Sequence, residues 1–113
     1  MRQRLRQEDG FTLPELLTTM TIGMILVLAT MTLVEVTWRN QCASCHGLIG
    51  RGDGPQGPMV HATNLTQPEW QAKVTDQDIA DVIRNGKNRM PRFDFPPDVV
   101  AGLVARIRMA RGR

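Results

Sequence analysis

The first third of the chain holds one long apolar stretch. Within residues 11–38 only Glu15 and Glu35 are charged, and residues 16–34 carry no charge at all. About 20 consecutive apolar residues are enough for a helix to cross the hydrocarbon core of a bilayer. The pattern therefore predicts a single membrane-length helix over residues 11–38.

A polar segment, residues 1–10, precedes this stretch and contains Arg2, Arg4 and Arg6. Basic residues in front of a spanning helix keep the N-terminus in the cytoplasm and place the rest of the chain outside. A cleavable secretory signal also starts with basic residues, but its apolar region is shorter and ends at a small-residue cleavage site. Here the apolar run continues past Ala29 and Thr30, which favours a retained helix over a cleaved signal.

Beyond Thr37 the long apolar pattern gives way, without a flexible linker, to shorter elements. Residues 47–64 are rich in glycine and proline and predict an irregular loop. Thr66 and Glu69 have the spacing of a capping box, which predicts a short helix that contains Trp70.

Two amphipathic helices are predicted in the last third of the chain. The first starts near Thr75 and ends at Gly86, and the second runs from about Pro97 to Ala110. Three arginines near the end of the last helix are Arg106, Arg108 and Arg111. We interpret them as a solvated helix end that matches the helix dipole, with an anionic partner site as the alternative.

Length and composition limit what this chain can build. A chain of 113 residues has room for one small domain and one appended element. The part after the long helix is shorter than about 80 residues, a size at which a hydrophobic core usually needs a disulfide, a metal or another staple. The formal net charge is +3, and basic residues are not interleaved with aromatic ones. A nucleic-acid partner is therefore not expected.

Both cysteines of the chain lie in one short segment, Cys42-Ala43-Ser44-Cys45-His46. Two thiols separated by two residues can reach the two vinyl groups on one edge of a porphyrin, and the histidine that follows is placed to ligate the iron. No second C-x-x-C or H-x-x-x-H pair is present to complete a zinc site. A thioredoxin-like dithiol and a chance match are the remaining alternatives. The segment predicts one covalently attached haem c.

The start of the long helix resembles the processing and assembly motif of type IV pilins and pseudopilins, in the run Gly10-Phe11-Thr12-Leu13-Pro14-Glu15. In that family a prepilin peptidase cuts after the glycine, and the new N-terminal phenylalanine is methylated. The resemblance implies processing between Gly10 and Phe11, and assembly through Glu15. A carboxylate near the end of a membrane helix is costly unless it is paired. Its partner would be the freed amine of Phe11 on a neighbouring subunit, whereas in a monomeric anchor Glu15 would reach the lipid headgroups.

The rest of the chain resembles class I c-type cytochromes. In that family a helix enters the C-x-x-C-H segment with an aromatic residue four positions before the first cysteine, the place that Trp38 occupies. The run Met90-Pro91-Arg92-Phe93 resembles the distal segment of the family. This implies that the Met90 thioether is the second axial ligand, opposite His46. Weaker candidates for this role are His61, Met59 and Met109.

Three further positions take their interpretation from the same resemblance. In the family a Gly-Pro pair follows the haem-binding histidine at a set distance, and its proline carbonyl accepts a hydrogen bond from the histidine Nδ1–H. Gly57-Pro58 stands at that distance from the histidine of this chain. The alternative for Gly57-Pro58 is a surface turn, and Pro55 is a second candidate for the acceptor. Trp70 would contact a haem propionate or pack in the haem pocket. Where the family usually has a glycine at its helix crossing, this chain has Val34, so the crossing is expected to be wider or shifted.

Together these features predict an all-α chain in three parts: a leader over residues 1–10, a pilin-like helix over residues 11–38 and a monohaem cytochrome domain over residues 39–113. Because His46 and Met90 would fill both axial positions of the iron, electron transfer is expected rather than enzymatic catalysis. The functional prediction is a subunit that leaves the bacterial inner membrane, assembles with copies of itself into a cell-surface filament and exchanges electrons with redox partner proteins. The alternatives are a monomeric membrane-anchored periplasmic cytochrome, and a pilin whose haem only stabilises its head.

Overall fold

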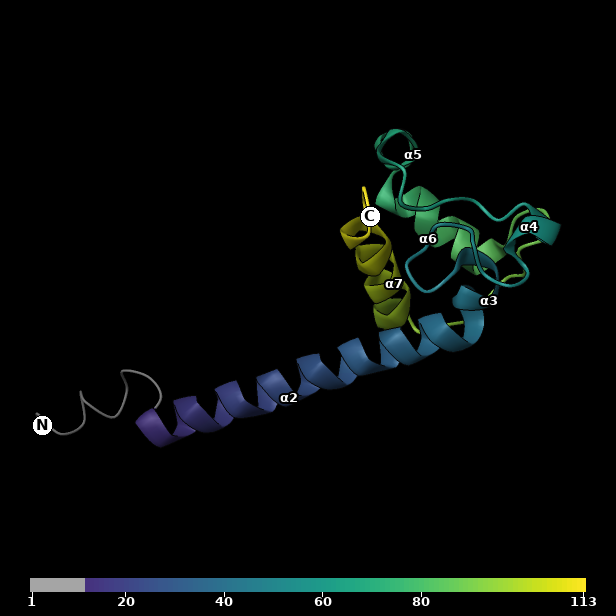
Figure 1. Cartoon of the computed structure of the whole chain (residues 1–113). Coiled ribbons are helices and arrows are strands. Elements are labelled where there is room, and N and C mark those ends of the chain that lie inside the picture. Colours follow the sequence, from purple (N-terminus) through teal and green to yellow (C-terminus); the bar gives the residue numbers. More distant parts are fainter. Residues whose placement is uncertain (1–11) are drawn as a thin grey trace, which may run out of the picture.

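The computed structural model describes residues 12–113, and over this range the chain is helical with no β-strand (Figure 1). One long helix, α2 (Leu13–Thr37), projects from a group of shorter helices formed by the rest of the chain. The prediction of an all-α fold with a long N-terminal apolar helix is confirmed. The predicted leader over residues 1–10, with Gly10, and the following Phe11 lie outside the described residues.

The first turn of α2 is held by a capping box. The Glu15 backbone N–H donates to the Thr12 hydroxyl (3.4 Å), and the Thr12 backbone N–H donates to a Glu15 carboxylate oxygen (3.3 Å). Pro14 lies in the first turn, where its missing N–H costs no hydrogen bond. The cap at Thr12 therefore fixes the start of α2 at Leu13.

The surface of α2 is apolar and exposed, and Val34 is the buried residue of this helix. Several threonine hydroxyls donate to the carbonyl four residues earlier, at 2.9–3.0 Å: those of Thr18, Thr19, Thr21, Thr30 and Thr32. A hydroxyl bonded in this way needs no water and no partner when it faces lipid. Within residues 12–113, the helix that contains α2 is the one long and apolar enough to cross a membrane.

α2 continues without a break into the segment that carries both cysteines. A π turn, η1 (Trp38–Cys42), follows Thr37 directly and leads into α3 (Ala43–His46), so one helix of 34 residues extends over Leu13–His46. Across the π turn, the Ala43 N–H donates to the Trp38 carbonyl five residues earlier. The prediction that the long helix enters the cysteine segment without a linker is confirmed.

Four shorter helices follow: α4 (Gly57–Val60), α5 (Pro68–Lys73), α6 (Asp76–Asn85) and α7 (Pro97–Met109). α6 and α7 lie where the sequence predicts them. A capping box formed by Thr75 and Asp78 starts α6, and Gly86 ends it with a φ of +76° that favours glycine.

Two details before α6 differ from the prediction. The glycine-rich loop contains one helical turn, α4, which is too short to show a periodic pattern. The predicted capping box of Thr66 and Glu69 is wrong. The Thr66 hydroxyl donates instead to the Asn64 side chain (2.7 Å), and α5 starts one residue later, after Gln67.

Arg108 is a structural residue of α7. Its guanidinium donates to the Asp76 carboxylate (2.7 Å) and to the carbonyls of Gln71 (2.6 Å) and Val74 (2.7 Å). These three bonds tie the end of α7 to the junction between α5 and α6.

Arg106 also contacts the rest of the protein, through a two-point ion pair with Glu35 of α2 (2.9 and 3.1 Å). The interpretation of the α7 arginines as a solvated helix end is therefore wrong for Arg106 and Arg108, and it holds for the exposed Arg111. The physical reason is that their partners come from distant segments, which the local pattern of charges does not reveal.

α2 and α7 cross in close contact at Val34 and Gly102. Val34 is 7% exposed, and a Cβ atom added to Gly102 would overlap the Val34 Cγ2 methyl group. The expected wider or shifted crossing is wrong, because α7 supplies the glycine that α2 lacks. In this chain the glycine at the crossing is Gly102, on α7 instead of α2.

Gly102→Ala should lower the free energy of unfolding by about 1–3 kcal/mol, because the β-branched Val34 side chain cannot rotate freely out of the way. Adding Val34→Ala should return part of this loss, with a coupling free energy of about 0.5–3 kcal/mol. Gly23→Ala is the matched control, since a Cβ there meets no atom within 4 Å. Chemical denaturation of the full chain in detergent measures these three variants and Val34→Ala alone, and additive effects of the two crossing substitutions would contradict the contact.

Candidate cofactor site

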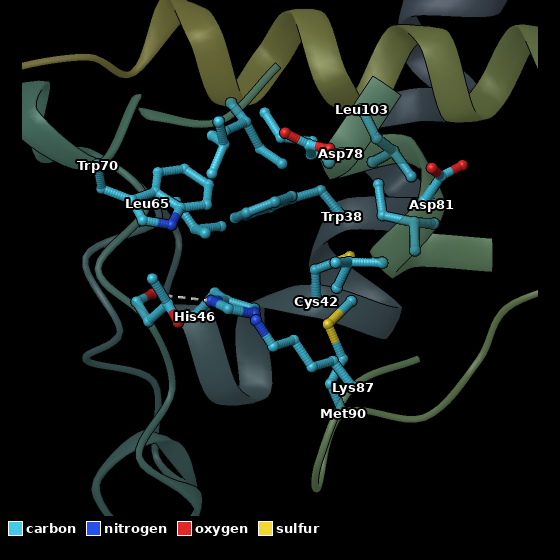
Figure 2. Close-up of a pocket in the computed structure, with 16 residues that line it drawn as sticks. Trp38, Cys42, His46, Leu65, Trp70, Asp78, Asp81, Lys87, Met90 and Leu103 are labelled. Atoms are coloured by element: carbon cyan, nitrogen blue, oxygen red, sulfur yellow. Dashed lines mark hydrogen bonds between the residues drawn. The ribbon is translucent and has the colours of Figure 1, made fainter. Parts of the chain in front are cut away.

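A cavity of about 440 Å³ lies where the end of the long helix meets α6, α7 and the segment that contains Met90 (Figure 2). This volume falls in the range of about 300–1,000 Å³ that is typical of small-molecule and cofactor sites. Most of its lining is apolar, from Trp38, Leu65, Trp70, Val74, Ile79, Val82, Ile83, Leu103 and Ile107. A second cavity of about 250 Å³ adjoins it, since Cys42, His46 and Met90 line both.

His46 is held by the backbone of a distant residue. Its Nδ1–H donates to the Thr63 carbonyl (3.1 Å), which Figure 2 shows as a dashed line. Burial lowers the pKa of His46, and the hydrogen bond to Thr63 opposes part of this effect. A neutral imidazole with its Nδ1 occupied in this way keeps Nε2 as the nitrogen for a metal.

Pro58 does not accept this hydrogen bond, contrary to the prediction. It lies in the single turn of α4, after which His61 adopts a left-handed conformation (φ 54°). The accepting carbonyl belongs to Thr63, five residues further along the chain. A backbone carbonyl has no side-chain signature, so the sequence could not identify Thr63. The nearest sequence signal is Gly52, where an added Cβ would meet the backbone just before Thr63.

The two cysteines lie at the end of the same helix as His46, outside its charge-free residues 16–34. Cys42 ends the π turn and lines both cavities, and Cys45 lies in α3 and lines the second. Burial raises the pKa of the Cys42 thiol to about 11, and the charge of Arg106 opposes part of this. A thioredoxin-like nucleophile needs a lowered thiol pKa, so the raised value disfavours that alternative.

Met90 enters the cavities from a tight turn over residues 87–90. The Met90 N–H donates to the Lys87 carbonyl (2.9 Å), the Lys87 N–H donates to the Met90 carbonyl (3.0 Å), and Asn88 between them is left-handed. Figure 2 shows the Met90 and His46 side chains in the same pocket, reaching it from different parts of the chain. The turn therefore brings a thioether to the space that the imidazole also lines.

The weaker ligand candidates differ in exposure and position. Met59 and Met109 are 73% and 78% exposed and are not among the residues that line either cavity. His61 lines the second cavity, and Trp70 lines the first. Glu15, predicted as an assembly residue, lies in the first turn of α2, whereas the residues of the long helix that line the cavities lie at its other end. Figure 1 shows the first turns of α2 far from the shorter helices.

The donor groups around the cavities fit a c-type haem. His46 and Met90 offer an imidazole and a thioether, two thiols lie beside them, and the walls suit a flat apolar macrocycle. A bare metal ion would need three or more His, Cys, Asp or Glu side chains together, and residues 12–113 contain no such group. The zinc alternative is therefore disfavoured.

Two family models match different parts of this chain. The prokaryotic N-terminal methylation motif matches residues 5–31, and the family described as cytochrome c oxidase, cbb3-type, subunit III matches residues 29–105. Among solved structures, the KustC0563 c-type cytochrome is similar, with a TM-score of 0.63 and 29% sequence identity over 68% of this chain and 95% of that chain. A search of curated proteins finds no match.

The cytochrome match covers well over half of the chain and contains both cysteines, His46 and Met90. The methylation motif covers the start of α2. The protein therefore belongs to the c-type cytochrome family described as cytochrome c oxidase, cbb3-type, subunit III, and it carries a type IV pilin methylation motif at its N-terminus.

Proposed function

We propose that this protein is a haem-bearing, type IV pilin-like subunit that assembles through α2 into a cell-surface filament and transfers electrons through its haem. The observation that carries this proposal is the unbroken helix over Leu13–His46, which joins the methylation motif to the cysteine segment. The proposed parts are a leader over residues 1–10, an assembly helix over residues 11–38 and a haem domain over residues 39–113. Because no flexible linker separates the last two parts, assembly of the helices would hold the haem domains at a fixed spacing.

In this proposal Cys42 and Cys45 would hold one haem c through two thioether bonds, and His46 and Met90 would bind its iron. The bound haem supplies reversible one-electron chemistry. Trp70 packs in the pocket and offers its indole N–H to a propionate.

The surrounding residues favour electron transfer over substrate chemistry. The Thr63 carbonyl orients the His46 ring through its 3.1 Å hydrogen bond. Buried side chains of α6 and α7, among them Ile83 and Leu103, keep water away from the cavity walls. Because His46 and Met90 would both bind the iron, no position would be left for a substrate. Redox partner proteins would exchange electrons with the site from outside.

The start of α2 supports the assembly part of the proposal. The methylation motif implies processing by prepilin peptidase, and we place the cut between Gly10 and Phe11. The Glu15 carboxylate receives a 3.3 Å hydrogen bond from the Thr12 N–H and keeps capacity to accept from a further donor. The freed amine of Phe11 on a neighbouring copy would be that donor, and its charge would offset the cost of a carboxylate in an apolar bundle.

A monomeric, membrane-anchored periplasmic cytochrome is the second candidate. The observation that favours it is the set of threonine hydroxyls bonded within α2, because such a helix also suits lipid on all sides. A third version, a pilin whose haem only stabilises the head, differs in the distances between haems in the filament. Imaging of filaments at a resolution that locates each haem would separate conduction from this structural role.

Glu15→Ala and Glu15→Gln should both abolish filaments and leave haem loading unchanged, because neither side chain carries the negative charge that would pair with a protonated amine. Glutamine keeps an acceptor for the Thr12 N–H, so it separates the helix cap from the charge. Electron microscopy of cell-surface material and haem absorbance measure the two outcomes. Normal filaments from both variants would refute the charge pairing, whereas a wild-type chain that forms no filaments would favour the anchored monomer.

In the double variant Cys42→Ser with Cys45→Ser, haem should no longer stay bound to the chain during denaturing electrophoresis, and the unfolding temperature should fall. A core of this size rarely supplies more than about 3–5 kcal/mol without a staple. Ser44→Ala is the matched control, because Ser44 is exposed and lies between the two cysteines. A double variant that lacks haem and unfolds at the wild-type temperature would count against the proposal.

Met90→Ala should keep the haem attached, change its absorbance spectrum and lower its reduction potential, because thioether ligation raises the potential. His61→Ala and the exposed-site control Met59→Ala should leave both unchanged. Spectroscopy and potentiometric titration measure these effects. A changed spectrum in His61→Ala, with Met90→Ala unchanged, would assign the ligand to His61 instead.

A further inference from the structure

Arg106 reaches from α7 to three segments around the proposed haem ligand. Its Nε and Nη2 atoms donate to the two Glu35 carboxylate oxygens (2.9 and 3.1 Å), and Nη2 also donates to the Leu48 carbonyl (2.8 Å). Its guanidinium carbon lies 4.2 Å from the centroid of the Trp38 ring, within cation–π distance. The Arg106 side chain is 20% exposed. It is therefore partly buried where α2, the π turn and the segment after α3 meet.

These contacts meet at the backbone directly after His46. Trp38 is 2% exposed, its Nε1–H donates to the Gly47 carbonyl (3.1 Å), and its ring centroid lies 6.4 Å from that of His46. Arg106 holds the next carbonyl, that of Leu48. Two consecutive carbonyls behind the histidine are thus fixed by a stacked tryptophan and arginine.

We propose that Arg106 is a positioning residue of the haem site. Together with Glu35 it fixes the support behind His46, formed by Trp38 and residues 47–48, and it sets the charge at that place. The proposal rests on the haem ligation by His46 proposed above.

The charge of the pair gives the proposal a signature that a purely structural role lacks. Arg106 and Glu35 cancel each other, and both are partly screened by water. Arg39 lies farther from Glu35 (3.7 Å) and is more exposed, so its charge is screened more strongly and it replaces Arg106 only in part. Loss of the arginine would leave a carboxylate, which favours the oxidised, more positive site and lowers the reduction potential. Loss of the carboxylate would leave a guanidinium, which raises it. A general loss of packing around α7, in contrast, would shift the potential in the same direction in both cases.

Potentiometric titration of the full, haem-loaded chain in detergent tests this proposal. Arg106→Met should lower the potential, and Glu35→Gln should raise it. Arg108→Met is the matched control, because Arg108 also makes an ion pair from α7 (2.7 Å), while its hydrogen-bond partners belong to the α5–α6 region. The control should lose thermal stability without a change in potential. Shifts of the same sign in Arg106→Met and Glu35→Gln, or an equal shift in Arg108→Met, would overturn the proposal.

Hydrogen exchange at the Trp38 indole N–H gives a readout that does not depend on haem. Arg106→Met should speed this exchange several-fold relative to Trp70, because the stacked arginine is lost, and Arg108→Met should not. Unchanged exchange at Trp38 in Arg106→Met would overturn the proposed support. A chain that binds no haem but shows the Trp38 effect would contradict the proposed function and leave the positioning role of Arg106 supported.

Discussion

The close crossing of α2 and α7 at Val34 and Gly102 is the contact on which the cofactor cavity depends. Beyond the crossing, α2 continues into the cysteine segment, which forms one wall of the cavity, and α7 contributes Leu103 and Ile107 to another wall. A wider crossing would move these walls apart. The missing side chain at Gly102 thus lets α2 and α7 meet closely at the edge of the cavity.

Polar side chains also stabilise the domain, through hydrogen bonds to backbone groups in loops and at helix ends. Gln71 is 5% exposed and donates to the carbonyls of Leu65 and Ile107 (2.8 Å each), so it bonds both a loop and the last turn of α7. Helix ends leave carbonyls without intrahelical donors, and a buried one needs such a partner. Within the described chain, every buried side-chain nitrogen and oxygen atom has a hydrogen-bond partner. A small apolar core is therefore accompanied by a polar framework that fixes where its helices end.

Sequence reasoning succeeded where the signal is local. Thr75 and Gly86 marked the two ends of α6, and the spacing of the cysteine–histidine segment predicted which side chains lie at one cavity wall. It failed where the deciding partner is distant. The glycine of the crossing is Gly102 on another helix, and the acceptor for the histidine is the backbone carbonyl of Thr63. Arg106 pairs with a residue 71 positions away, so its charge looked like that of any solvated helix end.

The π turn between α2 and α3 sets the rotational phase of the haem domain about the axis of the long helix. Each residue of an α-helix turns the chain by about 100°, so one residue more or less within η1 (Trp38–Cys42) would swing the whole domain by roughly that angle. Both halves of the protein could remain folded after such a change. If copies assemble in parallel as proposed, the cavity of each copy would then face a different neighbour, so the five residues of η1 would decide which cavities lie next to each other.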